Sequence, residues 1–164
     1  MNAPASSRPE GFRRVAEALA ALGHAHEPVF LDSAARTAQQ AADALGVSVG
    51  QIAKSIVFRR LHDGRAVLVV TSGDRRVDEV KVSARVGAVG RADAAFVKAA
   101  TSFAIGGVAP LGHAADPPPL VLIDRELLRF DEIWAAAGHP HGVFRLTPQE
   151  LTAFTGAPAE DVTS

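Results

Sequence analysis

The residues best suited to chemistry lie in one short run, Gly106-Gly107-Val108-Ala109-Pro110-Leu111-Gly112-His113. Glycine adopts backbone angles that other residues avoid and lets a ligand approach the main chain, while proline stiffens one edge of the run. Exposed backbone N–H groups can bind a carbonyl, a carboxylate or a developing oxyanion. A Gly/Pro cluster by itself also fits an ordinary surface turn. The run therefore predicts a ligand loop only if other reactive groups lie beside it.

Positive charge is concentrated in the middle of the chain. Ten Lys and Arg stand against five Asp and Glu between Lys54 and Lys98, a balance of +5. The remainder has seven basic and thirteen acidic residues, so the whole chain carries −1. Such a segment suits local binding of a polyanion, although a solvated surface explains it equally well. Lys54, which opens the segment, is the cation that we expect to act with the glycine run.

The chain offers no protein nucleophile of a known pattern. Cysteine is absent, which excludes disulfides, thiolate metal sites and a cysteine nucleophile. No G-x-S-x-G elbow is present, so a Ser-His-Asp triad has little support. His113, His139 and His141 leave a metallohydrolase open as an alternative, but no carboxylate or cysteine pattern accompanies them. We therefore expect no metal and no cofactor.

Length and composition indicate one domain. The 164 residues are 48% apolar, enough for a core, and we expect a disordered segment over 1–9 followed by a single domain over 10–164. The first residues lack the apolar run of a signal peptide, and no stretch approaches the roughly 18 apolar residues of a membrane span. These features predict a soluble, cytoplasmic protein with no membrane partner.

Apolar periodicity predicts the elements that position these residues. Two runs joined by Asp63-Gly64, 55–61 and 66–71, indicate a β-hairpin whose second strand is apolar on both faces. Capping boxes at Thr37 and Thr147 begin two of the helices. The expected strands and helices alternate irregularly along the chain, which favours an α+β fold with a mixed sheet. Further strands are expected at 28–31, 102–105, 120–123 and 143–146. Helices are expected at 12–22, 37–46, 48–51, 131–137 and 147–156. Another helical stretch is expected over 77–100, with a break at 87–90.

Several segments, in order, resemble the YbaK/prolyl-tRNA synthetase editing-domain family over roughly residues 25–155. The resemblance implies a curved, mainly antiparallel mixed sheet, barrel-like and flanked by helices. It also implies a free-standing domain that hydrolyses mischarged aminoacyl-tRNA in trans, mostly tRNA(Pro) carrying a wrong amino acid. The resemblance rests on a lysine opening the hairpin (53–58), the strand end at 69–74, the G-G-x-x-P-x-G loop (101–112), the I-D strand end (121–124), and Ala137-Gly138 followed by His141-Gly142.

The resemblance also assigns residues to roles. The family's lysine matches Lys54, and its glycine loop matches Gly106, Gly107 and Pro110. Hydrolysis of an activated ester needs a positioned water and donors that stabilise the negative charge on the carbonyl oxygen. Backbone N–H groups of the loop can be these donors. We therefore expect Lys54, Gly106 and Gly107 to be catalytic. Substrate binding is expected from Val108, Ala109, Pro110, Gly112 and His113, with His141 shaping the pocket as in the editing domains inserted in bacterial prolyl-tRNA synthetases.

Three further polar residues end neighbouring strands. Thr71 and Ser72 close the second hairpin strand and are expected to reach the ribose or the attacking water, although a strand-end turn explains them as well. Asp124 is expected to accept hydrogen bonds from the glycine loop and hold its shape. Trp134, at helical spacing from Ala137, is expected in the core.

Two points stay open on the sequence alone. The basic segment and the glycine loop also suit a non-catalytic module that binds a tRNA end, a nucleotide or an aminoacyl-adenylate. The amino acid removed is not fixed either. Ala109 stands where the cysteine-removing branch of the family usually has serine, which favours another small residue. Neither oligomeric state nor a synthetase partner can be deduced from these residues.

Overall fold

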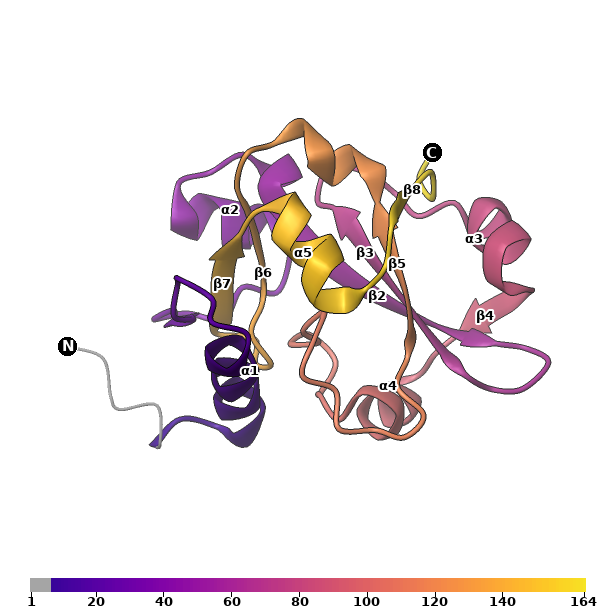
Figure 1. Ribbon diagram of the computed structural model, residues 1–164, viewed down its shortest axis with the longest axis horizontal. Helices are drawn as coiled ribbons and strands as arrows, with labels where there is room; N and C mark the ends of the chain where they lie inside the picture. Colours follow the sequence, from indigo (N-terminus) through magenta and orange to yellow (C-terminus); the bar gives the residue numbers. More distant parts are fainter. Residues whose placement is uncertain (1–6) are drawn as a thin grey trace.

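The computed structural model describes residues 7–164, so residues 1–6 of the segment expected to be disordered lie outside the described residues. Eight strands form one sheet in the order β1-β7-β6-β2-β3-β5-β8, with β4 paired to β2 (Figure 1). The strands are β1 Val29–Phe30, β2 Ile52–Arg60, β3 Ala66–Ser72, β4 Val89–Arg91, β5 Leu120–Asp124, β6 Ile133–Ala136, β7 Gly142–Leu146 and β8 Ala159–Glu160.

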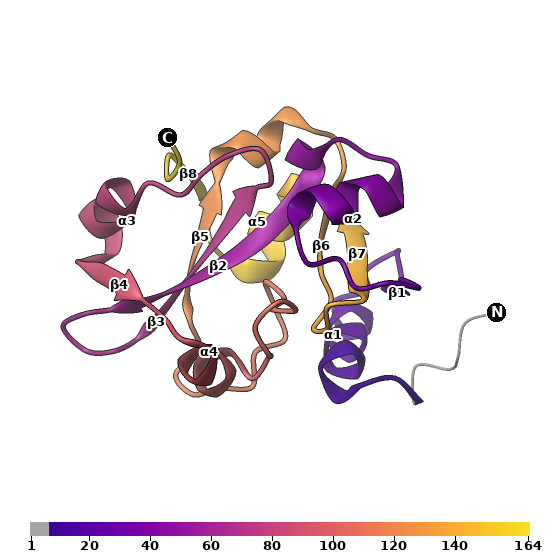
Figure 2. The same ribbon diagram turned by 180° about the vertical axis from the view of Figure 1, so that it is seen from behind.

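Helices lie around this sheet, and Figure 2 shows α2, α3 and α4 from behind. None within residues 7–164 is both long and apolar enough to cross a membrane. Their bounds are α1 Glu10–Ala21, α2 Ala38–Leu45, α3 Glu79–Val86, α4 Ala94–Thr101 and α5 Pro148–Thr155, with 3-10 turns η2 Val49–Gln51 and η3 Arg125–Arg129.

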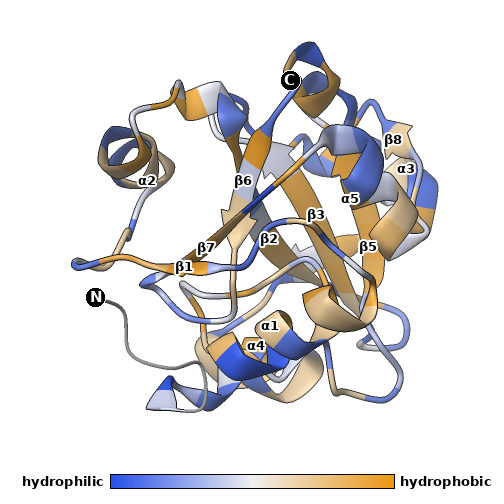
Figure 3. Ribbon diagram, turned by 60° about the vertical axis from the view of Figure 1, so that its left-hand side comes forward, coloured by the Kyte–Doolittle hydropathy of each residue, from blue (hydrophilic) through white to orange (hydrophobic). Residues whose placement is uncertain are grey.

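The mixed α+β class is confirmed by the strand directions. β2 pairs antiparallel with β3 and β4, and β7 pairs antiparallel with β1 and β6. β6 runs parallel to β2, and β5 runs parallel to both β3 and β8. All seven residues of β3 are buried, as its continuous apolar run predicts, because core packs against both of its faces (Figure 3).

Local signals place the helix ends correctly. The Thr37 side chain accepts a hydrogen bond from the Gln40 N–H, and α2 ends at Gly46 with φ of 69°. The full capping box forms at Thr147 and Glu150, with Pro148 in the first turn of α5. These interactions involve neighbours in sequence, which is why the sequence predicts them.

Two predicted elements are wrong. The helix expected at 131–137 is replaced by the strand β6, because Ile133 and Ala135 alternate as buried residues between two partner strands. Residues 102–105 form no strand: Ser102 ends α4 in the left-handed region with φ of 67°. The expected helix break at 87–90 is confirmed, since α3 ends at Val86 and α4 begins at Ala94, but the strand β4 between them was not predicted; it pairs with β2.

Candidate functional site

A cavity of about 500 Å³ opens beside β2 and brings together the two groups that the sequence singles out. Lys54 and Gly106 both contribute to its wall. The cavity also contacts α2, the start of α4, β6 and the turn after β6. Among its lining residues are Ala38, Ala41, Ile52, Ser55, Val57, Ala92, Val97, Ile105, Val108, Trp134, Ala135, His139 and Pro140.

The charge of the cavity is one-sided. No Asp or Glu is among its lining residues, whereas Lys54 and Arg36 both are. Within residues 7–164, neither of these two side chains has an ion pair or a side-chain hydrogen bond, although Lys54 is only partly exposed. An unpaired ammonium group in a partly desolvated, mainly apolar cavity favours an anionic ligand group.

The two central glycines of the loop have different positions. Gly106 has φ of 91° and faces the cavity. Gly107 is buried, and its N–H donates to the Ala104 carbonyl at 3.1 Å. A Cβ on Gly107 would lie 2.7 Å from the His139 Cα, closer than real Cβ atoms approach a neighbour. Gly107 therefore allows the loop to pack on the turn at His139, and its N–H is not available to a ligand.

The second half of the loop turns away from the cavity. Val108 lines it, but Ala109 and Pro110 are buried outside it, and the nearest neighbours of Gly112 include Ala18 of α1. The His113 Nε2 lies 2.8 Å from the Ala109 carbonyl oxygen. Ala109, Pro110, Gly112 and His113 therefore lie outside the cavity wall that Lys54 and Gly106 share, and their contacts within the protein stabilise the loop.

Burial also affects the charge of His113. Its ring contacts Phe103 edge-on at 5.7 Å between centroids. Burial lowers the pKa of His113, partly offset by its hydrogen bond to the Ala109 carbonyl.

The turn after β6 supplies a histidine to the cavity wall, and it is His139. Burial, and then the nearby His141, lower the pKa of His139. His141 lines a smaller adjoining hollow, with its Nδ1 2.8 Å from the Leu31 carbonyl oxygen and its ring stacked on Phe30. His139 was singled out in the sequence by its place in His139-Pro140-His141, but that spacing suggested a metal ligand and not a residue of the cavity wall.

No group of three or more His, Cys, Asp or Glu side chains is placed to hold a metal ion in the part of the chain that the structure describes. His139 and His141 are adjacent, with ring centroids 5.4 Å apart. His113 lines neither the cavity nor the adjoining hollow. The three histidines of the metallohydrolase alternative therefore do not form one site.

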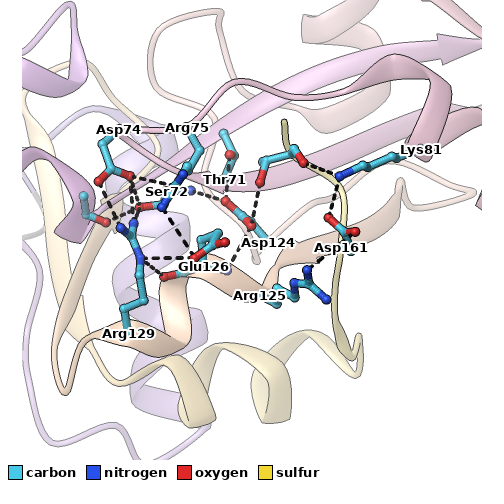
Figure 4. A network of polar contacts seen from close by, with 12 residues as sticks. Thr71, Ser72, Asp74, Arg75, Lys81, Asp124, Arg125, Glu126, Arg129 and Asp161 are labelled. Atoms are coloured by element: carbon cyan, nitrogen blue, oxygen red, sulfur yellow. Dashed lines mark hydrogen bonds and ion pairs between the residues drawn. The ribbon is translucent and has the colours of Figure 1, made fainter.

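Thr71, Ser72 and Asp124 form a separate buried network (Figure 4). All three are fully buried, and the Asp124 carboxylate accepts hydrogen bonds from the Thr71 hydroxyl, the Ser72 N–H and the Glu126 N–H. It also accepts one from the Thr163 hydroxyl. Asp124 therefore joins β3, η3 and the C-terminal segment, and not the glycine loop. Thr71 and Ser72 do not line the cavity, because the Thr71 hydroxyl donates to Asp124 and the Ser72 hydroxyl donates to the Gly50 carbonyl.

Trp134 is a cavity residue that the sequence did not identify. It lies on β6, paired with Ile52, and is only partly buried. Its indole N–H is buried and has no hydrogen-bond partner within residues 7–164. Trp134 packs against the core cluster of Ala41, Ala42 and Ile52, as expected, but it does so from a strand and not from the helix that its spacing suggested.

Known proteins share this fold and much of this sequence. The family model of the aminoacyl-tRNA editing domain matches residues 32–154. Uncharacterized protein YwhH of Bacillus subtilis (strain 168) is 37% identical over 125 residues, which cover 76% of this chain and 78% of YwhH. A crystal structure named as that of a candidate trans-editing enzyme for prolyl tRNA synthetase is 42% identical, with a TM-score of 0.87. The match covers 96% of this chain and 99% of that one. The crystal structure of hypothetical protein APE2540 is 29% identical, with a TM-score of 0.84 and coverage of 92% and 99%.

Proposed function

Because this chain belongs to the family of aminoacyl-tRNA editing domains, we propose that it hydrolyses the ester bond of mischarged aminoacyl-tRNA in trans. The proposed substrate is tRNA(Pro) carrying a small wrong amino acid. The observation that supports it best is the shared cavity, in which the unpaired Lys54 and the backbone at Gly106 lie together without any carboxylate. An ester next to a ribose and a phosphate has the matching chemistry.

In the proposed reaction a water oxygen forms a bond to the ester carbonyl carbon. The bond from that carbon to the ribose oxygen breaks, and the ribose oxygen leaves with a proton. Lys54 would bind the terminal phosphate or ribose, and backbone N–H groups would stabilise the negative charge that develops on the carbonyl oxygen. The adjacent ribose hydroxyl would help to orient the water, so no protein nucleophile is needed.

The cavity walls support a small acyl group. Alanine side chains contribute much of the surface, including Ala38, Ala41, Ala92 and Ala135, and the volume of about 500 Å³ must also admit part of the terminal nucleotide. Selectivity between neighbouring small amino acids then depends on single methyl groups, each worth about 1–3 kcal/mol. Alanine, serine, threonine, cysteine and 2-aminobutyrate are the candidates.

The partner of this site would be the acylated 3′ end of a tRNA, released by a synthetase into the cytoplasm. Association with prolyl-tRNA synthetase itself is a further part of the proposal, supported by the name of the 42% identical crystal structure.

A panel of charged tRNAs tests the function. Purified protein is incubated with tRNA(Pro) carrying each candidate amino acid, or proline as the correct control, and the released amino acid is measured over many turnovers. Catalytic release from at least one mischarged tRNA, with prolyl-tRNA spared, supports the deacylase. Stoichiometric binding without release would favour the non-catalytic module. Activity lost in EDTA and restored by zinc would instead indicate a metallohydrolase.

A further inference from the structure

The edge of β2 that faces the cavity is interrupted. On this side β6 pairs with Ile52 and Ala53, and β4 pairs with residues 58–60. Between them, residues 54–57 have no strand neighbour on this edge in the described part of the chain. The same four residues line the cavity. The cavity therefore occupies a gap in the sheet, with a strand on this edge before the gap and another after it.

Hydrogen bonds at the end of β2 show which peptide groups face the gap. The Arg60 N–H donates to the Arg65 carbonyl on the β3 side, whereas the Leu61 N–H donates to the Ala88 carbonyl on the β4 side. Successive residues of a strand direct their peptide groups to opposite edges. Counting back by twos from Leu61, the N–H and C=O groups of Val57 and Ser55 point into the gap, while those of Lys54 point to β3. Ser55 is the one of the two that is adjacent to Lys54.

We propose that Ser55 recognises the aminoacyl group as if it were one more residue of the sheet. The substrate's α-ammonium donates to the Ser55 carbonyl oxygen, and the Ser55 N–H donates to the ester carbonyl oxygen. This proposal rests on the proposed function and specifies its substrate class as esters of α-amino acids with a free amino group. No carboxylate lines the cavity to receive that ammonium, so a backbone carbonyl is the acceptor that the structure offers.

The direction of the acyl group follows from this pairing. A residue that exchanges both hydrogen bonds with Ser55 runs antiparallel to β2. Its ester end then points toward Lys54, where the ribose and phosphate are expected. Its side chain lies on the same face of the sheet as that of Ser55, whose hydroxyl oxygen is buried and has no hydrogen-bond partner within residues 7–164. The Ser55 carbonyl would thus bind the amino end of the ester, and the Lys54 ammonium would bind its ribose and phosphate end.

A series of three esters tests the proposal. tRNA(Pro) is charged with three acids. The first is the amino acid released fastest in the panel, the second has a hydroxyl in place of its α-amino group, and the third has a hydrogen in that place. Each enzymatic rate is divided by the spontaneous hydrolysis rate of the same ester, because the ammonium also activates the ester chemically. Loss of the charge-assisted bond should lower this ratio about tenfold for the hydroxy acid and about 100-fold for the third ester.

A variant pair tests the same contact from the protein side. Ser55→Pro removes the N–H that faces the gap and leaves the bonds to β3 in place, since those come from the neighbouring residues. Ser55→Ala keeps both peptide groups and serves as its reference. We expect Ser55→Pro to be at least about 30-fold slower than Ser55→Ala, with circular dichroism and melting temperature reporting on folding.

The outcomes separate this proposal from the function on which it rests. If the aminoacyl ester is cleaved but all three esters show equal enhancement, the Ser55 pairing is wrong and the deacylase stands. If no ester is cleaved, the function itself fails. If Ser55→Pro does not fold, the ester series alone decides.

Discussion

Replacement of Lys54 by alanine is the most direct test of the cavity chemistry. Among the described residues 7–164 the ammonium has no partner, and the cavity wall there holds no carboxylate, so its charge is available to the substrate. At a contact of about 4 Å and an effective dielectric constant of about 20, a charge pair is worth about 4 kcal/mol. Because Lys54 is partly exposed, water and salt reduce this to about 2–3 kcal/mol. Lys54→Ala should therefore slow deacylation about 30- to 150-fold.

The assay is single-turnover deacylation of the preferred mischarged tRNA at low and high salt. Lys98→Ala is the matched control, because Lys98 is an exposed lysine that does not line the cavity, and we expect its rate within about twofold of wild type. Lys54→Arg should retain part of the activity because it keeps the charge. The effect of Lys54→Ala should shrink at high salt. Full activity of Lys54→Ala would refute the assignment of this residue to the substrate.

Three further predictions concern other parts of the site. Gly107→Ala should destabilise the protein by about 1–3 kcal/mol and reduce deacylation, because the added Cβ meets the His139 backbone; urea denaturation measures the first effect, and unchanged stability would contradict the packing. Because partial burial holds the pKa of His113 below its usual 6.5, the unfolded chain binds more protons, so the free energy of unfolding should fall from pH 7 to pH 5, and His113→Gln should reduce that slope. The fluorescence of Trp134, the only tryptophan, should change when tRNA(Pro) binds, and a titration without any change would argue against occupation of this cavity.

Features that depend on neighbouring residues could be predicted from the sequence. The capping boxes at Thr37 and Thr147 set helix starts through bonds between residues three apart. The hairpin around Asp63-Gly64 follows from turn chemistry between two apolar runs. The ordered motifs also indicated the correct family, and with it the pairing of Lys54 with the glycine loop.

Features that depend on distant contacts could not be predicted. Residues 131–137 satisfy a helical spacing, but pairing with β2 and β7 makes them a strand and brings Trp134 to the cavity. A polar residue at a strand end can turn toward a ligand or into the core with equal local preference. The packing of β3 against Asp124 turns the Thr71 hydroxyl inward, and the close approach of Gly50 does the same for the Ser72 hydroxyl.

The amino-acid sequence by itself determined the fold class, most of the helices and strands, and the choice of Lys54 and Gly106 as candidates that share one cavity, because these follow from local bonding and from ordered motifs. The tertiary structure decided which side chains share a cavity with them. That choice depends on where β6 and β4 stop along β2, and the energy of packing residues far apart in the chain sets those limits.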